Sequence, residues 1–249
     1  RSTPSCTPPS ADDILASSLY PRQRLDPEEL RIVRNPFLPN FADLPSDLPI
    51  FPLSGAVVMP GVQLPLNIFE PRFLSMVQAA LAADHLIGMV QPQNSDDDAP
   101  VLHRIGCAGR ITSYSETSDG RIVMVLTGLC RFEIARELPE RDGYRRVQPV
   151  WDRFAADYDG DEQDITDRDQ FMGSLRAFCT RRSVEVPWDD IGKMADGDLV
   201  NLLCAHLPLG ADDKQALIEA IDLRERATLM RGLMDMSTLG GGIGNEQRH

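Results

Sequence analysis

The sequence contains no run of consecutive apolar residues that approaches the roughly 18 needed for a membrane-spanning helix. It also lacks a basic surplus: 25 basic against 38 acidic side chains leave a net charge of −13, which argues against non-specific binding to phosphate backbones. Only five cysteines occur among 249 residues, and none form a Cys-x-x-Cys pair, so a disulfide framework is not indicated. We therefore expect a soluble, cytoplasmic protein with no membrane partner and little affinity for nucleic acid.

The motifs of common catalytic and metal centres are absent as well. No Gly-x-x-x-x-Gly-Lys-Ser/Thr motif occurs, which excludes ATP binding by a P-loop in this sequence, and no Gly-x-Ser-x-Gly elbow is present. His103 and Cys107 are four residues apart on an expected strand, about 13 Å, beyond hydrogen-bonding distance. Neither the histidines nor the cysteines have zinc-type spacing. We expect buried, inert thiols, and no catalytic, cofactor-binding or metal-binding residue.

The acidic residues are concentrated in two short segments. Residues 152–170 hold eight acidic side chains against two arginines, and Asp96–Asp98 adds three more, so the two segments contribute −9 of the net charge of −13. Such runs are typical of solvated loops, and we expect both to be exposed. The run Asp157–Asp161 imitates the start of a calcium loop, but its glycine is at position four, and Arg168 occupies position twelve. This argues against calcium binding.

Proline and glycine mark the two ends of the sequence. Nine of the 19 prolines fall within residues 1–49, and three consecutive glycines occupy positions 240–242. We interpret residues 1–47 as a Pro-rich, loosely packed N-terminal arm and residues 237–249 as a flexible tail.

The sequence of residues 48–156 predicts a β-rich unit, because β-favouring segments alternate with turn signals. Asp119-Gly120 and Asp142-Gly143 are strong turn signals, because such dipeptides supply the positive φ angles that tight hairpins need. A single helix begins at Glu70-Pro71. The expected strands are Ile50–Leu53, Gln63–Phe69, Leu86–Gln91, Leu102–Glu116, Arg121–Ile134 and Tyr144–Phe154.

Residues 157–236 switch to a helical period and predict a helical bundle. Asp212 with Gln215, and Asp222 with Glu225, resemble capping boxes that begin two of its helices. Strands followed by helices predict the α+β class. The expected helices are Asp167–Arg181, Asp196–Leu207, Asp212–Ala220 and Asp222–Met236.

Four segments in order carry a resemblance to a known family. They are LPIFPLSGAVVMPGVQLPLNIFEPRFLSMVQAAL (residues 48–81), IGCAGRI (105–111), LTGLCRF (126–132) and LCAHLPLGADDKQALIEAIDLRERATLMRGLM (203–234). Together they resemble the LON substrate-binding domain, the N-terminal domain of ATP-dependent Lon proteases, over residues 48–236. The resemblance implies a PUA-like β pseudo-barrel followed by a C-terminal helical bundle, which agrees with the order of strands and helices.

Several residues in these segments also have a structural role that can be expected without reference to the family. Pro60-Gly61 is expected to turn the chain between two strands. Gly106, Gly109 and Gly128 lie inside expected strands, where a missing side chain permits a bulge or a close backbone approach.

The resemblance implies recognition of polypeptide and not its cleavage. A full Lon protease continues into an ATPase module and a Ser/Lys peptidase domain, and we expect neither here, as in stand-alone LON-domain proteins. The implied function is a non-enzymatic protein of the peptidase S16 family. It would bind exposed or unfolded polypeptide segments in protein quality control, with a separate Lon-type protease as a further partner.

The expected binding region surrounds Phe69, Arg72 and Phe73. An apolar groove on the pseudo-barrel, or between barrel and bundle, would hold an extended segment at a sheet edge. Two alternatives stay open: a peptidase-type accessory protein or hydrolase with an unrecognised site, and an RNA-binding PUA-like module. The basic cluster of Arg141, Arg145 and Arg146 beside Tyr144 favours the RNA module, whereas the net charge of −13 opposes it.

Overall fold

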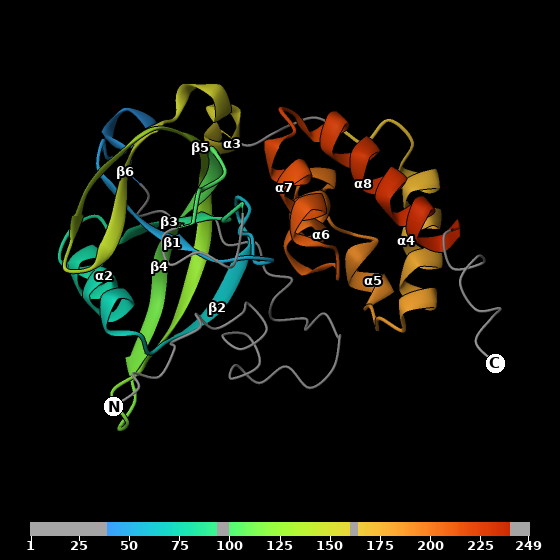
Figure 1. Ribbon diagram of the computed structural model, residues 1–249. Coiled ribbons are helices and arrows are strands. Elements are labelled where there is room, and N and C mark those ends of the chain that lie inside the picture. Colours follow the sequence, from blue (N-terminus) through green and yellow to red (C-terminus); the bar gives the residue numbers. More distant parts are fainter. Residues whose placement is uncertain (1–38, 94–99, 160–163, 240–249) are drawn as a thin grey trace, which may run out of the picture.

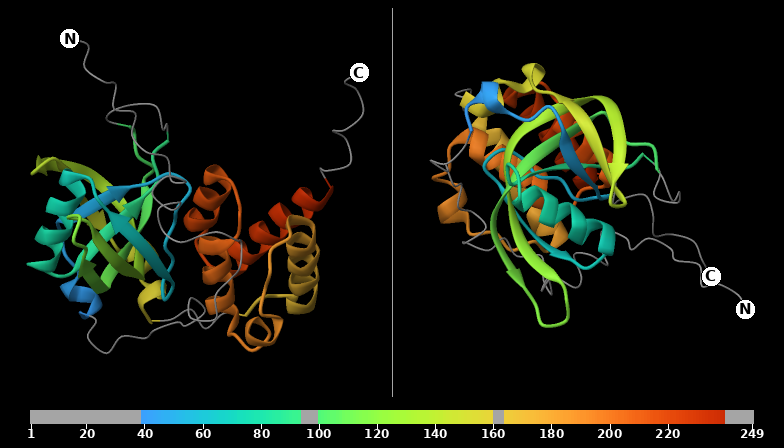
Figure 2. Two further views of the ribbon diagram at one scale, coloured as in Figure 1. Left: turned by 90° about the horizontal axis from the view of Figure 1, so that it is seen from below. Right: turned by 90° about the vertical axis from the view of Figure 1, so that its left-hand side faces the viewer.

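Strands and helices divide the chain in the order expected from the sequence. The computed structural model describes residues 39–93, 100–159 and 164–239. A curled sheet occupies one side of the molecule and a helical bundle the other (Figures 1 and 2). Most of the expected N-terminal arm, the run Asp96–Asp98 and the Gly240–Gly242 tail lie outside the described residues.

The sheet has six strands in the order β2-β5-β4-β3-β1-β6, and β6 also pairs with β5. The 20-residue strand β5 makes this curl possible, because its first part pairs with β2 and β4 and its last part with β6. The pair β1–β3 is parallel and the other pairs are antiparallel. The strands are β1 (Leu48–Pro52), β2 (Gln63–Ile68), β3 (Leu86–Val90), β4 (Ile105–Glu116), β5 (Ile122–Arg141) and β6 (Tyr144–Val150).

Turn chemistry sets the β5–β6 hairpin as expected, whereas at Asp119-Gly120 only the glycine has positive φ, 82°. Asp142 and Gly143 both have positive φ, 49° and 82°, which a two-residue hairpin turn needs. Strand β5 nevertheless extends seven residues beyond its expected end at Ile134. Residues 135–141 are mostly polar, so they lack the apolar pattern that predicts a strand. They are mostly exposed and pair only with β6.

The helices confirm the α+β class. Helix α2 (Pro71–Leu81) packs against β1, β3 and β6, and the bundle follows the sheet in the chain. The bundle region contains α3 (Ala156–Asp159), α4 (Arg168–Arg182), α5 (Trp188–Ile191), α6 (Asp196–His206), α7 (Ala211–Glu219) and α8 (Leu223–Leu239). No helix of the described residues is long and apolar enough to cross a membrane.

One of the two expected capping boxes is formed in part and the other is wrong. At the start of α8, the Glu225 N–H donates to Asp222 Oδ1 at 2.8 Å, and Glu225 Oε2 accepts from the Ile221 N–H at 2.8 Å. A full box would return the Glu225 carboxylate to the N–H of the N-cap residue Asp222, whereas it reaches Ile221. Helix α7 instead begins after Gly210, and the Gln215 side chain is buried against the sheet. A buried glutamine next to the sheet cannot reach back to cap its own helix.

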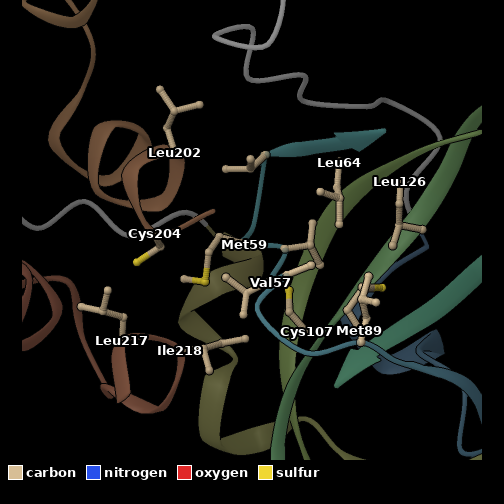
Figure 3. Close-up of a cluster of buried hydrophobic side chains, with 14 of the residues drawn as sticks. Val57, Met59, Leu64, Met89, Cys107, Leu126, Leu202, Cys204, Leu217 and Ile218 are labelled. Atoms are coloured by element: carbon tan, nitrogen blue, oxygen red, sulfur yellow. The ribbon is translucent and has the colours of Figure 1, made fainter. Parts of the chain in front are cut away.

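One of the two hydrophobic cores of the described residues runs through both halves of the molecule (Figure 3), and the other lies in the sheet half. The irregular loop between β1 and β2, residues 53–62, joins the two halves, because Val57 and Met59 are buried between the sheet and the bundle. Leu126 of β5 and Ile218 of α7 belong to the same core. Sheet and bundle are therefore packed as one structural unit.

Candidate functional site

Arg131, in the middle of the apolar strand β5, holds the sheet to the segment that leads into the bundle. Its side chain is 2% exposed and that of Asp157 is 8% exposed. Arg131 Nε lies 2.8 Å from Asp157 Oδ2, and Arg131 Nη2 lies 2.8 Å from Asp157 Oδ1. This fork-to-fork arrangement is the strongest form of an arginine–carboxylate pair.

The expected exposure of the acidic segment is therefore wrong at Asp157. Both carboxylate oxygens of Asp157 accept hydrogen bonds from Arg131, so neither is free to bind calcium. The sequence carries one signal for this pair, which is the charged Arg131 within the otherwise apolar run of residues 129–132. A charge at a buried strand position needs a buried partner.

The same guanidinium also contacts the C-terminal end of α7. Arg131 Nη1 donates to the carbonyl oxygens of Ile218, at 3.0 Å, and of Ala220. Arg131 Nη2 donates to the carbonyl oxygen of Ile221 at 3.2 Å. The end of a helix carries partial negative charge, which favours a cation there. Arg131 thus ties β5, the joint segment and the bundle together.

A second polar bridge crosses the joint beside the loop of residues 53–62. Gln91 Nε2 donates to Gln215 Oε1 at 3.1 Å, and Gln91 Oε1 accepts from the Gly55 N–H at 2.8 Å. Lys214 Nζ donates to the carbonyl oxygens of Gly55 at 3.0 Å and Ala205 at 2.9 Å. Burial lowers the pKa of Lys214 to about 8. These contacts link the loop to the sheet and to the bundle.

The four cysteines of the described residues are poorly suited to act as nucleophiles. Cys107, Cys130, Cys179 and Cys204 are buried, free thiols, as expected. Burial raises the pKa of Cys179 and of Cys204 to about 11, and raises those of the other two thiols as well. A thiol in this state is a poor nucleophile. No group of three potential metal ligands occurs in the described part of the chain.

Part of the exposed apolar surface of the sheet lies beside its edge strand β2. Within the described residues β2 is an edge strand that pairs only with β5 (Figure 1), so no described strand pairs with its other side, which we call its open side. Phe69, which follows β2, is 37% exposed, and Val123 of β5, opposite Asn67, is 45% exposed. The facing pair Pro65 and Val125 is half-buried. We call Pro65, Phe69, Val123 and Val125 the β2 strip.

The three residues expected to bind polypeptide lie in different environments. Phe69 belongs to the β2 strip, and Arg121 lies 6.0 Å from its ring. The Arg72 side chain is 43% exposed and pairs with Glu70 at 2.9 Å. Phe73 is buried, with its ring centroid 4.4 Å from that of Phe51. Contact of these residues with a bound polypeptide stays a prediction, and Phe73 would have to move to make one.

The basic cluster at the β5–β6 hairpin is largely neutralised. Arg145 makes two hydrogen bonds to the Glu137 carboxylate, at 2.6 and 3.0 Å, and Arg146 pairs with Asp47. The Tyr144 ring is buried and presents no face for a base to stack on. Only Arg141 has no ionic partner among the described residues. This arrangement weakens the case for a nucleic-acid site.

Known proteins similar to this chain are bacterial Lon proteases. The Lon protease of Flavobacterium johnsoniae is 26% identical over 196 residues, which cover 76% of this chain and 24% of the relative. The Lon protease of Parabacteroides distasonis is 30% identical over 191 residues, covering 72% of this chain and 22% of the relative. The chain thus spans about a quarter of the length of the relatives it matches.

Solved structures show the same fold for the N-terminal part of such proteins. A Lon N-terminal domain protein from Xanthomonas campestris aligns with a TM-score of 0.55 at 22% identity, covering 75% of this chain and 97% of that one. The N-terminal domain of a Mycobacterium avium complex Lon protease gives 0.57 at 18% identity, covering 76% and 98%. The family model of the ATP-dependent protease La (LON) substrate-binding domain matches residues 47–236. The chain therefore belongs to the LON substrate-binding domain family.

Proposed function

We propose that this chain recognises exposed or unfolded segments of other polypeptides and does not cleave them. Family membership supports a role in substrate recognition. The observation that carries the proposal is the β2 strip beside an edge strand with an open side. An exposed apolar strip next to a free sheet edge suits an extended polypeptide.

Strand addition explains how such a site could accept many sequences. Backbone N–H and C=O groups on the free edge of β2 would pair with the backbone of the bound segment, whatever its side chains are. Every second side chain of the segment would then face the β2 strip. Pro65 lacks an N–H group, which interrupts the edge and limits uncontrolled pairing with other strands.

The non-enzymatic part of the proposal is supported by the chemistry of the described residues. Their thiols are buried with raised pKa values, and they contain no metal-ligand cluster. We further propose that the protein acts in the cytoplasm in protein quality control, together with a Lon-type protease. The Lon relatives, which are proteases by name, motivate this partner.

A binding assay with a permanently unfolded protein, reduced and alkylated, tests the proposal. Phe69→Asp and Val123→Asp should each weaken binding about tenfold, because a charge placed on the strip must be desolvated when the segment binds. Val150→Asp is the matched control, since Val150 is 39% exposed on β6. Photo-crosslinking should map the contact to β2 and the start of β5.

Three results would contradict the proposal. The first is unchanged binding by both strip variants, which would place the contact elsewhere on the molecule. The second is the release of fragments from the unfolded protein without ATP, which would show hydrolysis. The third is a gel shift of RNA at low salt with no binding of unfolded protein, which would favour the nucleic-acid module.

A further inference from the structure

A small pocket lies at the far end of the sheet from the joint with the bundle, between helix α2 and the β5–β6 hairpin. Its volume is about 150 Å³. A cavity of about this size accommodates a group as large as benzene, and sites for drug-sized ligands start at about 300 Å³. The pocket therefore has room for a single amino-acid side chain and not for a cofactor.

Part of the pocket lining is apolar because the end of α2 is rich in alanine. Ala79, Ala80 and Ala83, whose side chains are single methyl groups, line it together with Leu48 and Leu86 of the sheet. Larger side chains at the alanine positions would fill the space. The hollow thus follows directly from the sequence of the last turn of α2 and the residues after it.

Charged groups on the rim of this pocket are only partly engaged. Arg146 is held by Asp47 and by the Pro139 carbonyl oxygen, so this charge is already neutralised. In contrast, no described residue forms a hydrogen bond or an ion pair with the side chains of Arg141, Asp84 or Tyr144. Among the described residues, one guanidinium, one carboxylate and one hydroxyl that line the pocket thus have no side-chain partner.

The turns that carry two of these free groups have an unusual backbone. Three non-glycine residues of the described chain have positive φ. Two of them are His85, at 62° beside Asp84, and Asp142, at 49° beside Arg141. Such conformations cost free energy and persist where the surrounding structure fixes them. Both rim residues are thus presented by defined turns.

We propose that this pocket binds the C-terminal residue of a polypeptide that ends in an apolar side chain. The inference rests on the proposed function and specifies the class of segment that is recognised. The α-carboxylate accepts hydrogen bonds from Arg141 and from the Tyr144 hydroxyl. The last backbone N–H donates to Asp84, and the apolar side chain enters the alanine-lined hollow.

The chemistry of the rim favours this occupant over two others. A guanidinium without a partner binds a carboxylate in a bidentate, charge-assisted manner, whereas a polypeptide N-terminus would bring a positive charge toward Arg141. A phosphate backbone would bring several negative charges, and no N–H donor for Asp84, to a rim that carries the carboxylates of Asp47 and Asp84. A C-terminal residue brings one carboxylate together with a backbone N–H. A C-terminal residue uses the free donors and the free acceptor together.

The test compares a short fluorescent peptide ending in leucine with the same peptide amidated at its C-terminus. Amidation removes the charge that Arg141 would bind, and we expect it to weaken binding about tenfold. Arg141→Gln should abolish the difference between the two peptides, and Ala83→Trp should block both. Arg136→Gln is the control, because Arg136 lies on the same strand with an exposed side chain that contacts Gln148.

The possible outcomes separate this inference from the proposed function. Equal affinity for the free and the amidated peptide would overturn the proposal that the pocket binds a C-terminal carboxylate. If unfolded protein still binds at the β2 strip in that case, the proposed function is unaffected. If neither peptide nor unfolded protein binds, the proposed function falls as well. Displacement of the peptide by a short RNA would overturn the assignment to a C-terminal residue. Thermal melts of Arg141→Gln and Ala83→Trp serve as the control that each variant is folded.

Discussion

At the scale of single residues, Arg131 shows what a buried charge requires. Its guanidinium has five N–H groups, and all five have acceptors: two on Asp157 and one each on Ile218, Ala220 and Ile221. A lysine at this position would offer three donors without the planar fork. The position is therefore matched to arginine by geometry as well as by charge.

Replacing Asp157 by asparagine should be strongly destabilising. The variant keeps the size of the side chain but leaves the buried guanidinium without a counter-charge, which costs about 3 kcal/mol in the free energy of unfolding. Urea unfolding of Asp157→Asn measures this loss. Asp152→Asn is the control, because Asp152 is exposed on the 3₁₀ turn Asp152–Phe154 just before α3.

A second variant shows whether the loss comes from an unpaired charge. Replacing Arg131 by methionine in the Asp157→Asn background removes the unpaired cation, so the double variant should lose less than the sum of the two single losses. Additive losses of stability would contradict this account of the pair. So would a decrease of less than about 0.5 kcal/mol in the free energy of unfolding of Asp157→Asn.

The sequence could predict part of this chemistry. The buried thiols followed from apolar surroundings. The role of Asp157 did not follow, because eight acidic residues in one segment have the same local context, and only the fold selects the one that meets Arg131.

At the scale of elements, the loop of residues 53–62 depends on glycine in the neighbouring strand β5. A Cβ atom added to Gly128 would lie 2.0 Å from the Met59 carbonyl oxygen, a distance that no relaxed structure permits. The Gly61 N–H donates to the Gly128 carbonyl oxygen at 2.9 Å, so the two backbones are held together. The glycine allows the loop to lie directly on the strand and carry Met59 into the core.

Gly128→Ala and Gly173→Ala should therefore have opposite effects. The first forces the loop away from β5 and should cost about 3 kcal/mol of stability, near the upper end for overpacking. Gly173, on α4, has no atom within 4 Å of an added Cβ, so its replacement should stabilise the helix by about 0.5–1 kcal/mol. Chemical denaturation measures both, and a Gly128→Ala variant as stable as the parent would refute the close approach.

Elements were predictable where local chemistry decides them. The hairpin turns and Pro60-Gly61 followed from residues that favour positive φ, and the helix after Glu70 from its proline and apolar stripe. The end of β5 and the role of Gln215 could not be predicted from local chemistry, because each depends on contacts with a distant segment. The open side of β2 likewise depends on the strand order, which no local pattern contains.

At the scale of the whole molecule, sheet and bundle share one core. The buried loop of residues 53–62 contributes to this core, and separating the halves would expose Val57 and Met59 on one side and Ile218 on the other. It would also leave the Arg131–Asp157 pair without the α7 carbonyl oxygens. Both costs act against a state in which only one half is folded. We therefore expect the two halves to unfold in a single cooperative transition.

The two tryptophans of the chain allow a direct test of this cooperativity. Trp151 packs on Phe132 in the sheet half, with ring centroids 5.6 Å apart, and Trp188 lies in the bundle beside the Arg176 guanidinium. In Trp188→Phe the fluorescence reports the sheet, and in Trp151→Phe it reports the bundle. Each variant is compared with the far-ultraviolet circular dichroism of the same sample, so that any shift in stability caused by the substitution cancels. Fluorescence and dichroism should give the same denaturation midpoint in both variants. A separate midpoint for either half would mean that the shared core and the Arg131 contacts are too weak to couple sheet and bundle.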